Sequence, residues 1–203
     1  MTPLLILASG NKAKLQEIKA LLTPFAAEVK TAAEMGFRAE IVENGRTFTE
    51  NAHLKARAVA AALNLPALAD DSGLAVECLG GRPGLLSARY CGVGANDHDN
   101  NRKLLREMAG QENRAACFVC ALACAQPDGS SIEAQGTLRG LISTDIRGEH
   151  GFGYDPLFLL PELGLTLAQI DGEIKNRLSH RGRALRLIMR KLPEFIGLPP
   201  AGA

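Results

Sequence analysis

The chain has 203 residues, of which 46% are hydrophobic, and this is enough apolar surface to build a core. Its 23 Lys and Arg residues nearly balance 22 Asp and Glu residues, which gives a formal net charge of +1. This balance excludes the strongly basic surface that binds duplex nucleic acid or an anionic membrane. We therefore expect one domain over residues 1–203, in which local groups hold any anionic ligand.

The location of the protein is predicted from its apolar runs and its cysteines. No apolar run is long enough to cross a bilayer, and Met1 to Pro3 lack the basic region of a signal peptide. Five cysteines are an odd set and suit a reducing compartment. Cys117 and Cys120 lie three apart in a predicted strand, where their side chains point to opposite faces, so metal or redox chemistry is not expected. We expect a cytoplasmic protein.

The chain opens with a predicted buried strand and an amphipathic helix. Leu4 to Ala8 is a continuous apolar run, and from Lys12 apolar residues recur at helical spacing. Ser9-Gly10-Asn11 between them predicts a tight loop, where backbone N–H groups and the helix dipole favour a phosphate. An ordinary helix cap with solvated lysines explains the loop as well, because it does not match the Walker A pattern.

A second helix is predicted from Thr47 to about Asn64. Thr47-Phe48-Thr49-Glu50 fits the capping box, in which Thr47 caps a backbone N–H and Glu50 reaches back to the cap. Glu43 lies just before this helix, and Lys55 lies within it. Magnesium usually takes one or two carboxylates with phosphate oxygens and water, so Glu43 is a candidate ligand, although alone it is more typical of a surface residue.

Asp70 and Asp71 follow a short strand predicted over 65–69. The run Asp70-Asp71-Ser72-Gly73 predicts a turn at which the chain leaves the sheet, with its polar residues facing an edge rather than a core. Adjacent carboxylates repel each other unless a cation, a proton or solvent relieves the repulsion. A cation site and an exposed acidic turn are both consistent with this run.

The remaining elements predict a mixed α/β fold with a partly antiparallel sheet. In chain order they are a loop over 80–84, a surface helix over 97–108, strands over 115–125 and 132–142 joined by a turn at 127–130, a strand over 157–160 and a final helix from about Ser179 to Leu192, ended by Pro193.

Two later segments carry polar and aromatic groups. Gly151 to Pro156 combines two aromatic residues with glycines, and Lys175 with Ser179 to Gly182 supplies hydrogen-bond donors. A tight turn explains the first segment equally well, and taken alone the second segment is more typical of a helix cap with solvated charges.

Six blocks occur in one order along the chain: SGNKAK, ENGRTFTENAHLKA, ADDSGL, GGRPGLLSARY, GFGYDPLF and SHRGRAL. Their order and spacing, from about residue 4 to residue 190, resemble the inosine triphosphate pyrophosphatase family. The resemblance implies an elongated central sheet flanked by helices, two lobes around an active-site cleft, and a homodimer. It also implies Mg²⁺-dependent hydrolysis of ITP, dITP and XTP to the monophosphate and pyrophosphate, by attack of water at the α-phosphorus, which keeps these nucleotides out of DNA and RNA.

The resemblance also implies roles for particular residues. Asp71 is the expected catalytic proton acceptor, and Glu43 and Asp71 are the expected magnesium ligands. The expected substrate-binding residues are Ser9, Gly10, Asn11, Lys12, Ala13, Lys14 and Lys55 for the triphosphate, and Ser72, Phe152, Gly153, Tyr154, Asp155, Lys175, His180 and Arg181 for the nucleoside.

Two other interpretations stay open. The Maf-like nucleotide pyrophosphatases share an opening similar to Leu7-Ala8-Ser9, but their double-arginine continuation is missing here and SHRGRAL favours the purine family. A nucleotide-binding module that does not hydrolyse its ligand would keep the phosphate loop. The presence of Glu43, Lys55 and Asp71 argues against such a module.

Overall fold

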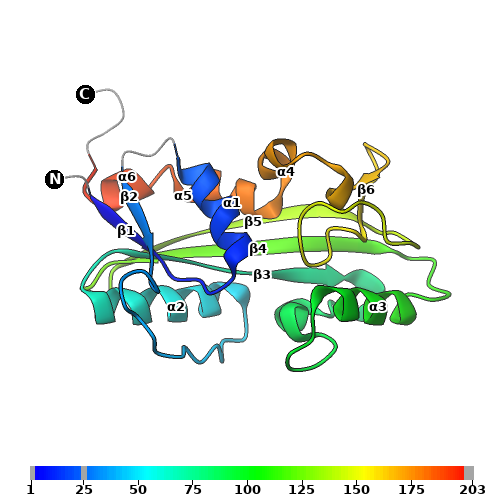
Figure 1. The fold of residues 1–203 in the computed structure, drawn as a ribbon, viewed down its shortest axis with the longest axis horizontal. Coiled ribbons are helices and arrows are strands. Elements are labelled where there is room, and N and C mark those ends of the chain that lie inside the picture. Colours follow the sequence, from blue (N-terminus) through cyan, green and yellow to red (C-terminus); the bar gives the residue numbers. More distant parts are fainter. Residues whose placement is uncertain (1–2, 24–26, 199–203) are drawn as a thin grey trace. The chain divides into compact units, whose positions relative to one another are not determined.

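The computed structural model describes residues 3–23 and 27–198, and within them seven strands form one mixed sheet (Figure 1). The strand order is β2-β1-β3-β4-β5-β6-β7. Pairs β1–β2 and β1–β3 are parallel, whereas β5–β6 and β6–β7 are antiparallel, so the predicted mixed α/β class is confirmed. The strands are β1 Leu4–Leu7, β2 Glu28–Thr31, β3 Ala67–Val76, β4 Ala115–Ala125, β5 Ser131–Ile142, β6 Phe158–Leu160 and β7 Leu165–Thr166.

Helices flank the sheet, and the chain divides into two compact units. The helices are α1 Lys12–Leu22, α2 Phe48–Leu63, α3 Asp97–Glu107, α4 Gly172–Leu178, α5 His180–Ile188 and α6 Leu192–Phe195. Unit 1 consists of Met1–Asp71, Cys120–Gly136 and Arg181–Ala203, and unit 2 of Ser72–Val119 and Thr137–His180. The chain therefore passes several times between the units, and the expected single domain stays a prediction. No helix in the described part of the chain is long and apolar enough to cross a membrane.

The core of unit 1 lies on both faces of β1. Leu5 and Leu7 pack with Ile18 of α1 and with α5, whereas Ile6 packs with the alanine-rich face of α2. Successive strand residues point to opposite faces, so a continuous apolar run is what a strand covered on both sides requires. Figure 1 shows α1 and α5 on one side of the strands of unit 1 and α2 on the other.

The core of unit 2 is built around aromatic residues. The rings of Phe118 and Phe158 lie with their centroids 4.5 Å apart, and α3 adds Leu104. Tyr154 is buried in the same cluster, and its hydroxyl donates a hydrogen bond of 2.9 Å to the backbone oxygen of Ser87. A buried tyrosine hydroxyl normally needs such a partner.

The predicted turn at Asp70 and the predicted single final helix are wrong. The expected turn at Asp70 to Gly73 is part of β3, which continues to Val76, and Asp70 is only 1% exposed. Cationic side chains reach both carboxylates, so neither one has to leave the sheet for water. The predicted final helix is two helices, because Pro193 lies in the first turn of α6, a position where its missing N–H costs little.

The cysteines are free thiols, as expected for a chain without a disulfide framework. Burial raises the pKa of Cys120 to about 12 and that of Cys124 to about 12. Thiols with such a pKa are poor nucleophiles at neutral pH. The absence of a redox role for Cys117 and Cys120 stays a prediction.

Candidate functional site

The loop between β1 and α1 forms a helix cap. The side chain of Asn11 accepts a hydrogen bond of 3.1 Å from the backbone N–H of Lys14, and the Ser9 hydroxyl accepts one of 3.3 Å from the backbone N–H of Asn11. The cap directs α1 so that Lys14, one turn in, reaches β3. Gly10, Lys12 and Asn11 are exposed, and phosphate binding by this loop stays a prediction.

Asp70 is the carboxylate of β3 on the α1 side. Its Oδ2 lies 3.0 Å from the Lys14 ammonium and 3.6 Å from Nη2 of Arg181, whose Nη1 contacts Glu17 of α1. Burial by itself raises the pKa of Asp70, but Lys14 and Arg181 outweigh it and hold this pKa well below its ordinary value. The pKa of Arg181 is raised in turn, because Asp70 and Glu17 outweigh its own burial. Asp70 is therefore ionised and held between two cations.

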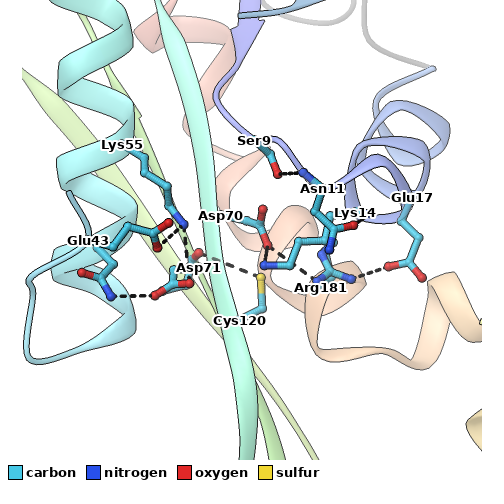
Figure 2. A network of polar contacts seen from close by, with 12 residues as sticks. Ser9, Asn11, Lys14, Glu17, Glu43, Lys55, Asp70, Asp71, Cys120 and Arg181 are labelled. Carbon is cyan, nitrogen blue, oxygen red and sulfur yellow. Dashed lines mark hydrogen bonds and ion pairs between the residues drawn. The ribbon is translucent and has the colours of Figure 1, made fainter. Parts of the chain in front are cut away.

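Asp71 lies on the opposite face of β3 with different partners (Figure 2). Its Oδ1 lies 3.5 Å from the Lys55 ammonium, which is also 2.9 Å from Oε2 of Glu43. Asn51 of α2 donates a hydrogen bond of 3.0 Å to Asp71 Oδ2. Burial nevertheless outweighs Lys55 and Asn51, so the pKa of Asp71 is raised.

Lys55 is the cation that the two expected metal ligands share. Burial lowers its pKa, but Asp71 and then Asp70 outweigh burial, so the pKa is raised and the side chain stays charged. Residues 3–23 and 27–198 contain no group of three or more His, Cys, Asp and Glu side chains placed to hold a metal ion. Two carboxylates fit magnesium, which takes one or two of them and completes its shell with phosphate oxygens and water.

Within unit 2, the expected nucleoside residues Phe152, Asp155 and Lys175 lie together. The Lys175 ammonium is 2.5 Å from Oδ2 of Asp155 and 4.8 Å from the centroid of the Phe152 ring. The same Asp155 oxygen accepts a hydrogen bond of 2.8 Å from the Phe152 backbone N–H. Gly151 has φ +78°, and a Cβ there would overlap Asp155 Oδ2, so this tight loop requires a glycine.

The other expected nucleoside residues have various surroundings. Gly153 is held by α3, because its N–H donates to Asp97 at 2.6 Å and its oxygen accepts from Asn101 at 2.8 Å. The ring of His180 stacks on Phe118 with centroids 4.6 Å apart. Tyr154 belongs to the core of unit 2, and Ser72 lies on β3 in the same unit. Arg181 belongs to unit 1 and contacts Asp70 and Glu17.

Sequence reasoning missed two polar side chains in unit 1. Glu17 contacts Arg181, and Asn51 contacts Asp71. A signal for both was present, since Glu17 follows Lys14 by three residues and Asn51 precedes Lys55 by four, spacings that put side chains on one helix face.

The fold and this site define a class of mixed α/β proteins in which lysines on helices face carboxylates on a central strand. Such an arrangement can bind a polyphosphate together with a divalent cation. A family model described as the Ham1 family matches residues 5–191, and the chain belongs to this family.

Individual relatives agree with the family. A "dITP/XTP pyrophosphatase" of Desulfotalea psychrophila is 46% identical over 97% of this chain and 88% of its own length, and one of Bacillus subtilis is 45% identical over 92% and 96%. Among solved structures, the Ham1 protein of Staphylococcus aureus is 39% identical with a TM-score of 0.85, over 95% of this chain and 99% of that one. A HAM1 protein of Coxiella burnetii is 38% identical with a TM-score of 0.87, over 95% and 100%.

Proposed function

We propose that this chain is a nucleoside triphosphate pyrophosphatase that hydrolyses dITP, XTP and ITP to the monophosphate and pyrophosphate. The observation that carries the proposal is the convergence of Glu43 and Asp71 on the Lys55 ammonium, at 2.9 and 3.5 Å. Curated relatives that are about as long as this chain and 45 to 46% identical to it are named dITP/XTP pyrophosphatases, which supports the same reaction.

The chain's own groups would bind the triphosphate and move one proton. Lys14 and Lys55 offset the negative charge of the phosphates, with the loop at Ser9 to Ala13 supplying backbone N–H groups. Asp71 accepts the proton of the water that attacks the α-phosphorus, and its raised pKa moves it toward the range that suits a general base. Magnesium, which Glu43 and Asp71 would hold, neutralises charge on the phosphate oxygens when it is bound.

Selectivity for the base would come from the groups in unit 2. Hypoxanthine and xanthine present an oxygen at the 6-position, where adenine presents an amino group, so cationic and N–H donors accept the first two and leave adenine poorly paired. Lys175 and His180 are the donors of unit 2 that we assign to this task, and Phe152 offers a stacking face. The family resemblance also implies Arg181, which belongs to unit 1 and contacts Asp70 and Glu17. A polar mismatch in a desolvated pocket produces strong discrimination.

A substrate panel tests the proposal directly. Pyrophosphate release by the purified protein would be measured with dITP, XTP, ITP, ATP and GTP, each with magnesium and with an excess of chelator. We expect the first three substrates to turn over much faster than ATP and GTP, and the chelator to abolish every rate. Absence of pyrophosphate release from all five would contradict the proposed reaction, and equal rates would contradict the assigned selectivity.

The assembly and the location are also proposals. We propose a homodimer that works in the cytoplasm on a small nucleotide, without a nucleic-acid or membrane partner. Light scattering coupled to size exclusion measures the mass in solution, and a mass near 21.6 kDa, that of one chain, would contradict the dimer.

A further inference from the structure

Asn51, in the first turn of α2, is a buried amide whose two ends contact different parts of unit 1. The residue is 5% exposed. Its Oδ1 accepts a hydrogen bond of 2.8 Å from the backbone N–H of Gly45, and its Nδ2 donates one of 3.0 Å to Asp71 Oδ2. The amide thus joins the loop that carries Glu43 to the strand that carries Asp71.

The chemistry of the amide fixes its orientation. A carboxamide has one acceptor side and one donor side, and a backbone N–H such as that of Gly45 can only face the acceptor. The NH₂ group must then face Asp71, whose carboxylate accepts. The reverse orientation would place two donors together at Gly45 and an oxygen against a carboxylate, so both contacts support a single placement.

This contact gives the two oxygens of Asp71 different surroundings. Asn51 holds Oδ2, while Oδ1 lies 3.5 Å from the Lys55 ammonium. A carboxylate anchored through one oxygen has a defined rotation about its last torsion angle. The other oxygen, Oδ1, then has a fixed orientation, and a reacting group requires a fixed orientation.

The loop is shaped to reach this amide. A Cβ on Gly45 would lie 2.6 Å from Asn51 Oδ1 and 3.0 Å from the Asn51 backbone nitrogen, so only glycine allows this approach without a shift. The next residue is also tied to α2, because the Arg46 N–H donates to the Glu50 carboxylate at 2.6 Å. Glu43 lies two residues before Gly45, so the hydrogen bond at Gly45 limits where the Glu43 carboxylate can lie relative to Asp71.

We propose that Asn51 is a positioning residue for the reaction. It sets the orientation of the Asp71 carboxylate and the placement of the Glu43 loop relative to it, and it does so without contacting the substrate. This inference rests on the proposed pyrophosphatase function, because it assigns Asn51 a role that acts through Asp71.

Two variants of Asn51 separate positioning from folding. Asn51→Leu keeps the size of the side chain and removes both hydrogen bonds. Asn51→Asp keeps the acceptor for Gly45 but offers Asp71 a carboxylate in place of a donor, so it serves as the test if the leucine variant does not fold.

A misplaced catalytic group costs up to about 10²-fold in rate, so we expect kcat to fall about 10- to 100-fold in both variants. KM for dITP should stay within about 3-fold of wild type, because the phosphate-binding lysines are untouched.

Asn100→Leu is the matched control. Asn100 is 2% exposed and also makes two hydrogen bonds, but both go to the backbone, from the Cys91 N–H at 2.8 Å and to the Ala88 oxygen at 3.2 Å. This control should lose unfolding free energy and keep its kcat. An unchanged kcat in Asn51→Asp or Asn51→Leu, or a rise in KM without a fall in kcat, would overturn the positioning role. A wild-type protein that releases no pyrophosphate would instead refute the function on which the role rests.

Discussion

Asp70 and Asp71 are neighbours on one strand, and their surroundings push their pKa values in opposite directions. Asp70 faces Lys14 and Arg181, and its pKa is lowered despite complete burial. Asp71 faces Lys55 and Asn51, and its pKa is raised. Two residues of one type, separated by one peptide bond, therefore differ in chemistry because a strand turns them to opposite faces.

The charges close to each carboxylate explain the difference. Asp70 lies 3.0 Å from the Lys14 ammonium and 3.6 Å from the Arg181 guanidinium, whereas Asp71 lies 3.5 Å from the Lys55 ammonium, which also contacts Glu43, and Glu43 itself raises the pKa of Asp71. Burial penalises both charges, but only Asp70 receives enough opposite charge to offset it. We infer that Asp70 mainly holds α1 and Arg181 in place, and that Asp71 is the carboxylate left able to accept a proton.

The largest expected effect is on turnover when Asp71 is changed. Asp71→Asn removes the proposed base and one magnesium ligand, so kcat/KM for dITP should fall on the order of 10²- to 10⁴-fold. Its fold should persist, because the ionised form of Asp71 is already disfavoured by burial. Steady-state pyrophosphate release measures the first effect and thermal unfolding the second. Near-normal turnover in a folded Asp71→Asn protein would remove Asp71 from the mechanism.

Asp70→Asn should give the opposite result, a large loss of stability. It leaves Lys14 and Arg181 without their shared buried carboxylate, and breaking a buried pair typically costs about 3–5 kcal/mol of unfolding free energy. Chemical denaturation measures this loss. Glu28→Gln is the control, because Glu28 pairs with Lys30 at 2.9 Å on the surface and such pairs contribute about 0–1 kcal/mol. Equal losses in the two variants would mean that the buried cluster is no more important than a surface pair.

The stability gap between wild type and Asp70→Asn should also depend on pH. Lys14 and Arg181 lower the folded-state pKa of Asp70, whereas the pKa of an unfolded aspartate is about 3.9. The contribution of Asp70 is therefore complete above the unfolded pKa and is lost as pH falls through the lower folded value. Denaturation at about pH 7, 5 and 3 should show a constant gap at first and a smaller gap at the lowest pH. A gap that widens toward acid would show that Asp70 is not held as the anion.

Much of the fold could be predicted from the sequence, since local patterns are strong where burial is periodic. Strands β1 and β4 and helix α2 lie within one or two residues of their predicted bounds. Strands β2 and β7 and helix α4 were missed, because they are only 4, 2 and 7 residues long and carry little periodicity. The error at Asp70 had a different cause, because local sequence favours a turn and only the cations of α1 and α5 make a buried strand possible.

The candidate site was also partly predictable, because local sequence patterns mark some of its residues. The family blocks pointed to Lys14, Lys55, Glu43 and Asp71. In unit 1, Lys55 contacts Glu43 and Asp71, whereas Lys14 contacts Asp70 on the opposite face of β3. Asn51 lies inside one of these blocks and has no charge, and its spacing of four residues from Lys55 indicates only that the two share a helix face. Its importance depends on the contact with Asp71, twenty residues away in sequence.

The smallest expected effect concerns α2, the helix whose Asn51 and Lys55 side chains contact Asp71. Thr47 caps α2 by accepting a hydrogen bond of 3.1 Å from the Glu50 N–H, although Glu50 reaches Arg46 rather than the cap residue of the predicted box. Thr47→Ala should cost about 1 kcal/mol of unfolding free energy. Because the first turn of α2 carries Asn51, it should also lower kcat by a few-fold. Thr47→Ser keeps the hydroxyl and should restore both quantities. If Thr47→Ala loses stability but keeps its full kcat, the first turn of α2 does not limit the placement of Asp71, and the two faces of β3 differ only in their charges.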